Sequence, residues 1–90
     1  MLYRLRLSKE AQRQLERLPG NIRQRIRQTI AELAYDPRPA AAKQMEDDLS
    51  DYYRIRIENY RVIYTIDDKI ILIEIIRVTK RTPKTYQGLP

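Results

Sequence analysis

The chain has 90 residues, of which 18 are Lys or Arg and 12 are Asp or Glu, giving a formal net charge of +6. It contains no Cys and no His, which excludes a disulfide framework, a cysteine nucleophile, a Ser-His or Cys-His dyad and an ordinary zinc site. The composition, 42% hydrophobic and 33% charged, predicts a single small domain over residues 1–90, cytoplasmic and without a membrane-spanning segment.

The first third of the sequence predicts a strand followed by two helices. Charged and apolar residues alternate over residues 2–7, as in a half-buried strand, and Ser8 is placed to cap a following helix. Pro19-Gly20 ends that helix, and Asn21 with Gln24 resembles a capping box that begins a second one. The apolar residues on one face of the second helix are Ile22, Ile26, Ile30 and Leu33. We expect the helices to form an antiparallel hairpin.

The second half of the sequence predicts strands joined by short turns. Residues 40–50 are too weakly patterned to assign beyond a loop or one helical turn. Apolar or alternating runs then predict strands at residues 52–57, 60–66 and 69–78. Because the last run is apolar on both faces, we expect it to be the central strand. The order βααβββ predicts an α+β fold, in which the helix hairpin packs on a small, mainly antiparallel sheet.

Positive charge is concentrated toward the two ends of the sequence. Residues 1–35 hold eight basic and three acidic residues, and residues 75–90 hold four basic residues and no acidic one. A uniformly solvated surface would spread this charge more evenly. A polyanion such as RNA or DNA is therefore the leading class of partner.

Part of the positive charge falls on one face of the predicted sheet. The period of two along a strand places Arg54 and Arg56 on one face, and Arg61 on the corresponding face of the next strand, which we expect to be open to solvent. Surface arginines are usually only solvated, and spacing alone favours that simpler interpretation. Against it, like charges on neighbouring strands repel, and Glu58 and Glu74 are too few to neutralise the group. The pattern therefore suggests a missing anion.

Several motifs occur together in a particular order. They are the element order βααβββ, the doublet Arg54-Ile-Arg56, the motif Asn59-Tyr60-Arg61-Val62-Ile63-Tyr64, and Lys80-Arg81 followed by Tyr86. Over nearly the whole chain this combination resembles the RelE/ParE toxin superfamily, and its RelE branch in particular. The resemblance implies a RelE-like fold and the toxin of a type II toxin-antitoxin system. It also implies a ribosome-dependent endoribonuclease that cuts mRNA, needs no cofactor or metal, and is neutralised by a cognate antitoxin.

The resemblance also implies which residues form the active site: Arg54, Arg56, Arg61, Lys80, Arg81 and Tyr86. Cleavage by the ribose 2′-OH requires removal of its proton, stabilisation of charge on the phosphorus, and a proton for the leaving 5′-oxygen. Arginines suit the second task because their planar forks bind phosphate oxygens with two bonds. Some relatives have lysines at the strand doublet, whereas an arginine does not release its proton. The general base is therefore open between Tyr86, Lys80 and a group of the ribosome.

Two other functions are compatible with the sequence. The ParE branch shares the fold but is associated with poisoning DNA gyrase, so that interpretation keeps the toxin and discards RNA cleavage. A non-enzymatic module that binds nucleic acid or ribosomes would need only the net charge of +6 and the seven Tyr. The basic residues together with Tyr86 favour the nuclease, and simple binding does not explain the ordered motifs.

Overall fold

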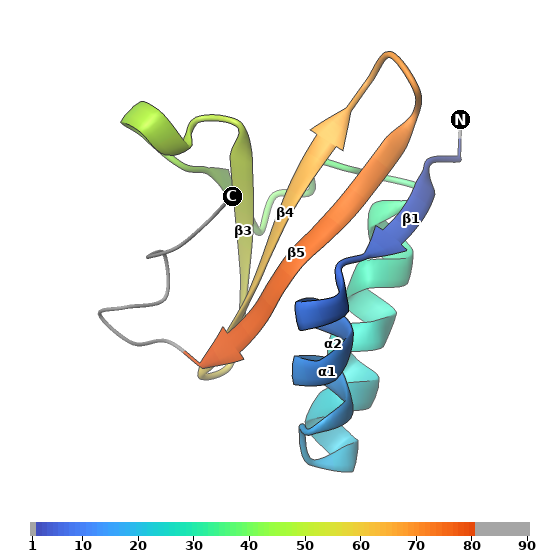
Figure 1. Cartoon of the computed structure of the whole chain (residues 1–90), viewed down its shortest axis with the longest axis vertical. Helices are drawn as coiled ribbons and strands as arrows, with labels where there is room; N and C mark the ends of the chain where they lie inside the picture. The colour runs from blue at the N-terminus through green and yellow to red at the C-terminus, as the bar shows by residue number, and fades with distance from the viewer. Residues whose placement is uncertain (1, 81–90) are drawn as a thin grey trace.

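The computed structural model describes residues 2–80, in which two helices lie on one face of a five-stranded sheet (Figure 1). The elements are β1 (Arg4–Leu7), α1 (Lys9–Glu16), α2 (Gly20–Leu33), β2 (Ala42–Gln44), the 3₁₀ helix η1 (Asp47–Leu49), β3 (Tyr52–Ile57), β4 (Tyr60–Asp67) and β5 (Leu72–Lys80). The strand order is β1-β5-β4-β3-β2, with β1 parallel to β5 and the other neighbours antiparallel. The predicted α+β fold is confirmed. Neither helix in this part of the chain is long and apolar enough to cross a membrane.

Ser8 caps helix α1, as predicted, and hydrogen bonds connect Ser8 and α1 to strand β5. The hydroxyl of Ser8 accepts a hydrogen bond from the backbone N–H of Ala11 at 3.0 Å and donates one to the carbonyl of Ile76 at 2.8 Å. One turn later, the side-chain oxygen of Gln14 accepts from the backbone N–H of Val78 at 2.7 Å. Side chains of α1 therefore satisfy backbone groups on the stretch of β5 that extends beyond β1.

Helix α2 starts without the capping box that the sequence suggested. The carbonyl of Pro19 accepts the first helical hydrogen bond, from the N–H of Arg23 at 2.8 Å, so Asn21 already lies inside the first turn. The predicted cap is therefore wrong, because the helix starts at Gly20. The predicted apolar stripe is confirmed, since Ile26, Ile30 and Leu33 are buried and Ile22 is half-buried.

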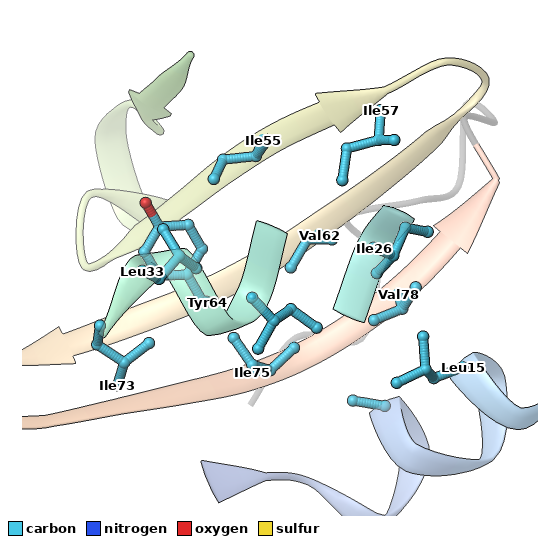
Figure 2. Packing of buried hydrophobic residues seen from close by; sticks show 12 residues of the cluster. Leu15, Ile26, Leu33, Ile55, Ile57, Val62, Tyr64, Ile73, Ile75 and Val78 are labelled. Carbon is cyan, nitrogen blue, oxygen red and sulfur yellow. The ribbon is translucent and has the colours of Figure 1, made fainter. Parts of the chain in front are cut away.

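The main core lies between the two helices and the sheet face that they cover (Figure 2). The strand residues on this face are Ile55, Ile57, Val62, Tyr64, Ile73, Ile75 and Val78. Tyr64 is fully buried, and its hydroxyl donates a hydrogen bond to the carbonyl of Pro37 at 2.8 Å. Burial raises the pKa of the Tyr64 hydroxyl above its ordinary value, because the ionised form would lose its hydration.

Two parts of the sheet differ from the sequence prediction. The connector contains β2, which pairs with β3, so β4 and not β5 is the middle strand. Strand β5 also begins later than predicted, because Ile70 and Ile71 belong to the turn after β4. Ile71 has a positive φ of 56°, which is strained for a β-branched residue, and Ile70 is 51% exposed. Because Ile70 and Ile71 are apolar, the sequence pattern wrongly extended the predicted strand into this turn.

Candidate functional site

The three arginines of the predicted set that lie on β3 and β4 occupy the sheet face opposite the helices. Arg54 and Arg56 alternate along β3 with Ile55 and Ile57, which point into the core. The antiparallel register pairs Arg56 directly with Arg61. Paired residues project from the same face of a sheet, so these two guanidinium groups start as immediate neighbours. We call the surface formed by Arg54, Arg56 and Arg61 the arginine face.

The arginines differ strongly in exposure. Arg56 is exposed and Arg54 is half-buried, whereas Arg61 is only 5% exposed. The expectation that Arg61 stands on an open surface is therefore wrong, although its face was predicted. A buried guanidinium keeps its positive charge, because arginine is not deprotonated in proteins, and that charge is screened less than one in water. Arg61 can thus act on a nearby anion through its field, while Arg56 is accessible for direct contact.

The two glutamates considered as neutralising groups are engaged by arginines of other elements. A terminal nitrogen of Arg25 on α2 lies 2.9 Å from a carboxylate oxygen of Glu58, which occupies the turn between β3 and β4. The Nε atom of Arg6 on β1 lies 3.1 Å from a carboxylate oxygen of Glu74. These ion pairs draw both carboxylates toward other elements of the fold.

The remaining residues of the predicted active site are placed differently or lie outside residues 2–80. Lys80 is paired with Tyr60, a residue that packs against the main core, while Thr79 is the partner of Arg61. The register therefore places Lys80 on the opposite face from the arginines, at the end of β5. Arg81 and Tyr86 lie outside the described residues.

Sequence reasoning did not find Lys43, although it also lies on the arginine face. Strand β2 pairs Lys43 with Arg54, and Lys43 is exposed. The signal in the sequence was weak, because β2 has three residues and offers little alternation to detect. Lys43 therefore adds an exposed positive charge on β2, next to the arginine face.

Arg77 reaches the same side of the sheet because of a β-bulge. Ile63 is paired with Arg77 and Tyr64 with Ile75, so Ile76 is an extra residue in β5. The side chain of Arg77 is 11% exposed, and its Nε atom lies 3.8 Å from a carboxylate oxygen of Glu10. Strict alternation would have placed Arg77 with Ile75 on the core face, so no sequence period predicts its position.

The end of this face next to η1 is apolar. A second, smaller hydrophobic cluster fills it, consisting of Tyr52, Ile63 and Ile76 with Met45 and Leu49 packed against them. Within residues 2–80, no group of three or more Asp, Glu, His or Cys side chains could hold a metal ion. The chemistry this face offers is therefore that of fixed cations beside a closed apolar cluster, which suits an anionic ligand with a repeated charge.

The comparisons with known proteins give the family of a chain with this fold and this basic face. The sequence model described as "ParE toxin of type II toxin-antitoxin system, parDE" matches residues 5–83. The chain therefore belongs to this toxin family, within the RelE-like branch of the RelE/ParE superfamily. A comparison with curated protein sequences finds no significant match.

Solved structures of RelE proteins have the same fold. A chain of the archaeal RelE–RelB complex from Pyrococcus horikoshii is 30% identical, with a TM-score of 0.79 and coverage of 92% of this chain and 99% of that one. A chain of the RelBE2 toxin-antitoxin complex from Mycobacterium tuberculosis is 28% identical, with a TM-score of 0.79 and coverage of 90% and 100%. The isolated RelE toxin from E. coli is 25% identical, with a TM-score of 0.75 and coverage of 90% and 88%.

Proposed function

We propose that this toxin is a ribosome-dependent endoribonuclease that cleaves mRNA in the cytoplasm and so inhibits translation. The observation that carries the proposal is the cross-strand pair of Arg56 and Arg61, with Arg54 on the same face. Positive groups fixed on a rigid sheet are suited to a phosphodiester whose negative charge increases during the reaction. The net charge of +6 would also attract the toxin to an RNA-rich particle such as the ribosome.

In the proposed reaction, the ribose 2′-oxygen attacks the adjacent phosphorus and the bond from phosphorus to the 5′-oxygen breaks. Arg56, which is exposed, contacts the phosphate oxygens directly, and Arg61 stabilises the additional charge from its buried position. The reaction also needs a proton acceptor and a proton donor. Since Lys80 lies on the other face, we assign proton transfer to Tyr86 or to a ribosomal group. The variant Tyr86→Phe distinguishes these two candidates, because loss of the hydroxyl abolishes cleavage only if Tyr86 itself transfers the proton.

A cognate antitoxin is the second proposed partner. The similar P. horikoshii and M. tuberculosis proteins were solved in complexes with RelB antitoxins, which supports an equivalent partner here. The exposed positive charge of Arg56 and Lys43 would favour an antitoxin segment with net negative charge.

One specific observation favours a different target. The matching family model carries the ParE name. As described for the sequence, resemblance to that branch implies DNA gyrase as the target. Inhibition of gyrase would keep the toxin role but would need neither a 2′-OH nor a proton acceptor.

A paired experiment tests the two targets. The toxin is expressed briefly without antitoxin, the 5′ ends of mRNA are mapped, and gyrase supercoiling is assayed with purified toxin. We expect new mRNA ends within reading frames for the wild type and for Arg13→Ala, an exposed helix variant, but not for Arg56→Ala. If supercoiling is inhibited and the mRNA ends are unchanged, the proposed nuclease is wrong and the toxin is a gyrase inhibitor. If the toxin has no effect in either assay, both proposed activities are wrong.

A further inference from the structure

A row of directly paired residues crosses the sheet on the arginine face. Lys43 of β2 is paired with Arg54 of β3, Arg54 with Ile63 of β4, and Ile63 with Arg77 of β5. Neighbouring strands are about 4.8 Å apart, so the row runs perpendicular to the strands at close spacing. Residues two positions apart on a strand point to the same face, as Arg54 and Arg56 do on β3. The row therefore lies next to the pair of Arg56 and Arg61 on that face.

Access to the positive charges in this row differs between its two ends. On the β2 side, Lys43 is exposed and Arg54 is half-buried. On the β5 side, the side chain of Arg77 is only 11% exposed and lies beside Glu10, and Ile63 between the two ends is fully buried. Along this row, a polyanion therefore meets accessible positive charge toward β2 and little toward β5.

An acidic segment lies just beyond Lys43. Strand β2 ends at Gln44, and Glu46, Asp47 and Asp48 follow, all exposed. Met45 and Leu49 hold this segment against the sheet by packing on the smaller hydrophobic cluster. Along the chain, Lys43 is therefore the last cation before a run of carboxylates, which repel phosphates.

We infer that Lys43 binds a backbone phosphate of the nucleotides that flank the cleavage site, and that the RNA leaves the arginine face over β3 and β2. Arg54 binds the phosphate between Lys43 and the pair of Arg56 and Arg61. Lysine suits this role because its ammonium group binds phosphate as a point charge and no proton transfer is required. The inference rests on the proposed RNA cleavage and adds a binding residue and a direction for the substrate.

The variants Lys43→Ala, Lys43→Arg and Lys69→Ala test the inference. Lys69 is an exposed lysine in the turn after β4, so Lys69→Ala removes the same net charge away from the arginine face. Cleavage is measured with programmed ribosomes. We expect Lys43→Ala to raise KM about tenfold with kcat unchanged, as for loss of one charged hydrogen bond. Lys43→Arg should restore KM and Lys69→Ala should not change it. An unchanged KM for Lys43→Ala, or no restoration by Lys43→Arg, overturns the inference.

A second measurement separates the inference from the proposed function. The probe is a single-stranded oligonucleotide with 2′-deoxyribose, which cannot be cleaved by its own 2′-oxygen, and its affinity is measured over a range of salt concentrations. Loss of one phosphate contact should reduce the slope of log K against log[salt] by about 0.7 for Lys43→Ala but not for Lys69→Ala. If the wild type binds with this Lys43-dependent slope but cleaves nothing, the proposed nuclease is wrong and the phosphate contact stands. Equal slopes for the two variants, or no binding by the wild type, overturn the inference.

Discussion

The two faces of β4 bury polar side chains for different purposes. Tyr64, on the face covered by the helices, is fully buried, and its hydroxyl donates to the carbonyl of Pro37. Arg61, on the opposite face, is 5% exposed and carries a full positive charge. Burial of a hydrogen-bonded hydroxyl costs little, whereas burial of a charge opposes folding unless other interactions compensate for it. The comparison indicates that apolar packing on the helix-covered face offsets the free-energy cost of burying the charged side chain of Arg61 on the arginine face.

The largest effect should follow from a cavity in the helix-covered face. Ile75 is fully buried in the main core, so Ile75→Ala removes apolar contacts and leaves space between β5 and the helices. We expect the free energy of unfolding to fall by about 2–5 kcal/mol, measured by urea denaturation. Cleavage per folded molecule should stay near the wild-type rate. A large loss of that rate would show that the two faces are not separable.

The second effect should appear on the arginine face, in activity. Arg56 is exposed, so Arg56→Ala creates no cavity, and stability should change by less than about 0.5 kcal/mol. Cleavage on programmed ribosomes should fall about 10²-fold to 10³-fold, as for loss of a group that stabilises transition-state charge. Arg13→Ala, which removes an exposed arginine from α1, is the matched control. Equal losses for the two variants would favour diffuse electrostatic binding over a defined site.

A smaller effect should result from removal of a single hydroxyl from the helix-covered face. Tyr64→Phe keeps the ring but leaves the Pro37 carbonyl without this donor. Loss of the hydrogen bond should reduce the free energy of unfolding by about 1 kcal/mol, detectable as a shift in the urea midpoint at constant slope. Normal cleavage with reduced stability would sharpen the contrast with Arg61 on the same strand. A cleavage defect in this variant would contradict the division between the faces.

The smallest effect concerns the turn after β4, at the end of the sheet away from Arg56 and Arg61. Asp68 accepts a hydrogen bond from Tyr3 at 2.6 Å and pairs with Arg38 at 2.9 Å. The hydrogen bond from Arg38, followed by that from Tyr3, lowers the pKa of the Asp68 carboxyl below its ordinary value. A lowered carboxyl pKa adds stability above the unfolded-state value of about 4, and this stability is lost as the pH falls through the folded-state value.

Asp68→Asn should therefore lower stability slightly at neutral pH, approach the wild type at low pH and so flatten the acid limb of a plot of stability against pH, and high salt should reduce the difference. The effect is small because both partners in the ion pair are about half exposed and thus well screened. Thermal denaturation between pH 3 and pH 7 measures it, with the exposed Asp51→Asn as control. Parallel curves for the wild type and Asp68→Asn would show that this ion pair does not contribute.

The features that the sequence predicted are those set by neighbouring residues. Ser8 caps α1 because its side chain needs only the next turn, and β3 has the predicted bounds because alternation continues over six residues. Lys43 was missed because a three-residue strand has no detectable period. The positions of Arg77 and Val78 depend on a bulge formed by pairing with β4, which no local pattern in β5 encodes. The 5% exposure of Arg61 likewise depends on packing across the folded chain, because alternation determines only the face.

The parallel pairing of β1 with β5 has a consequence for the biosynthesis of this toxin. Contacts of β1 and of Ser8, the residue after it, with β5 join residues 68 positions apart, such as Arg6 with Glu74 and Ser8 with Ile76. Such distant contacts form late, since a long loop must close before they contribute to stability. A nascent chain that ends before residue 72 has made its first strand but not the partner of that strand. The sheet of this toxin is therefore completed only after β5, which begins at Leu72, has been synthesised.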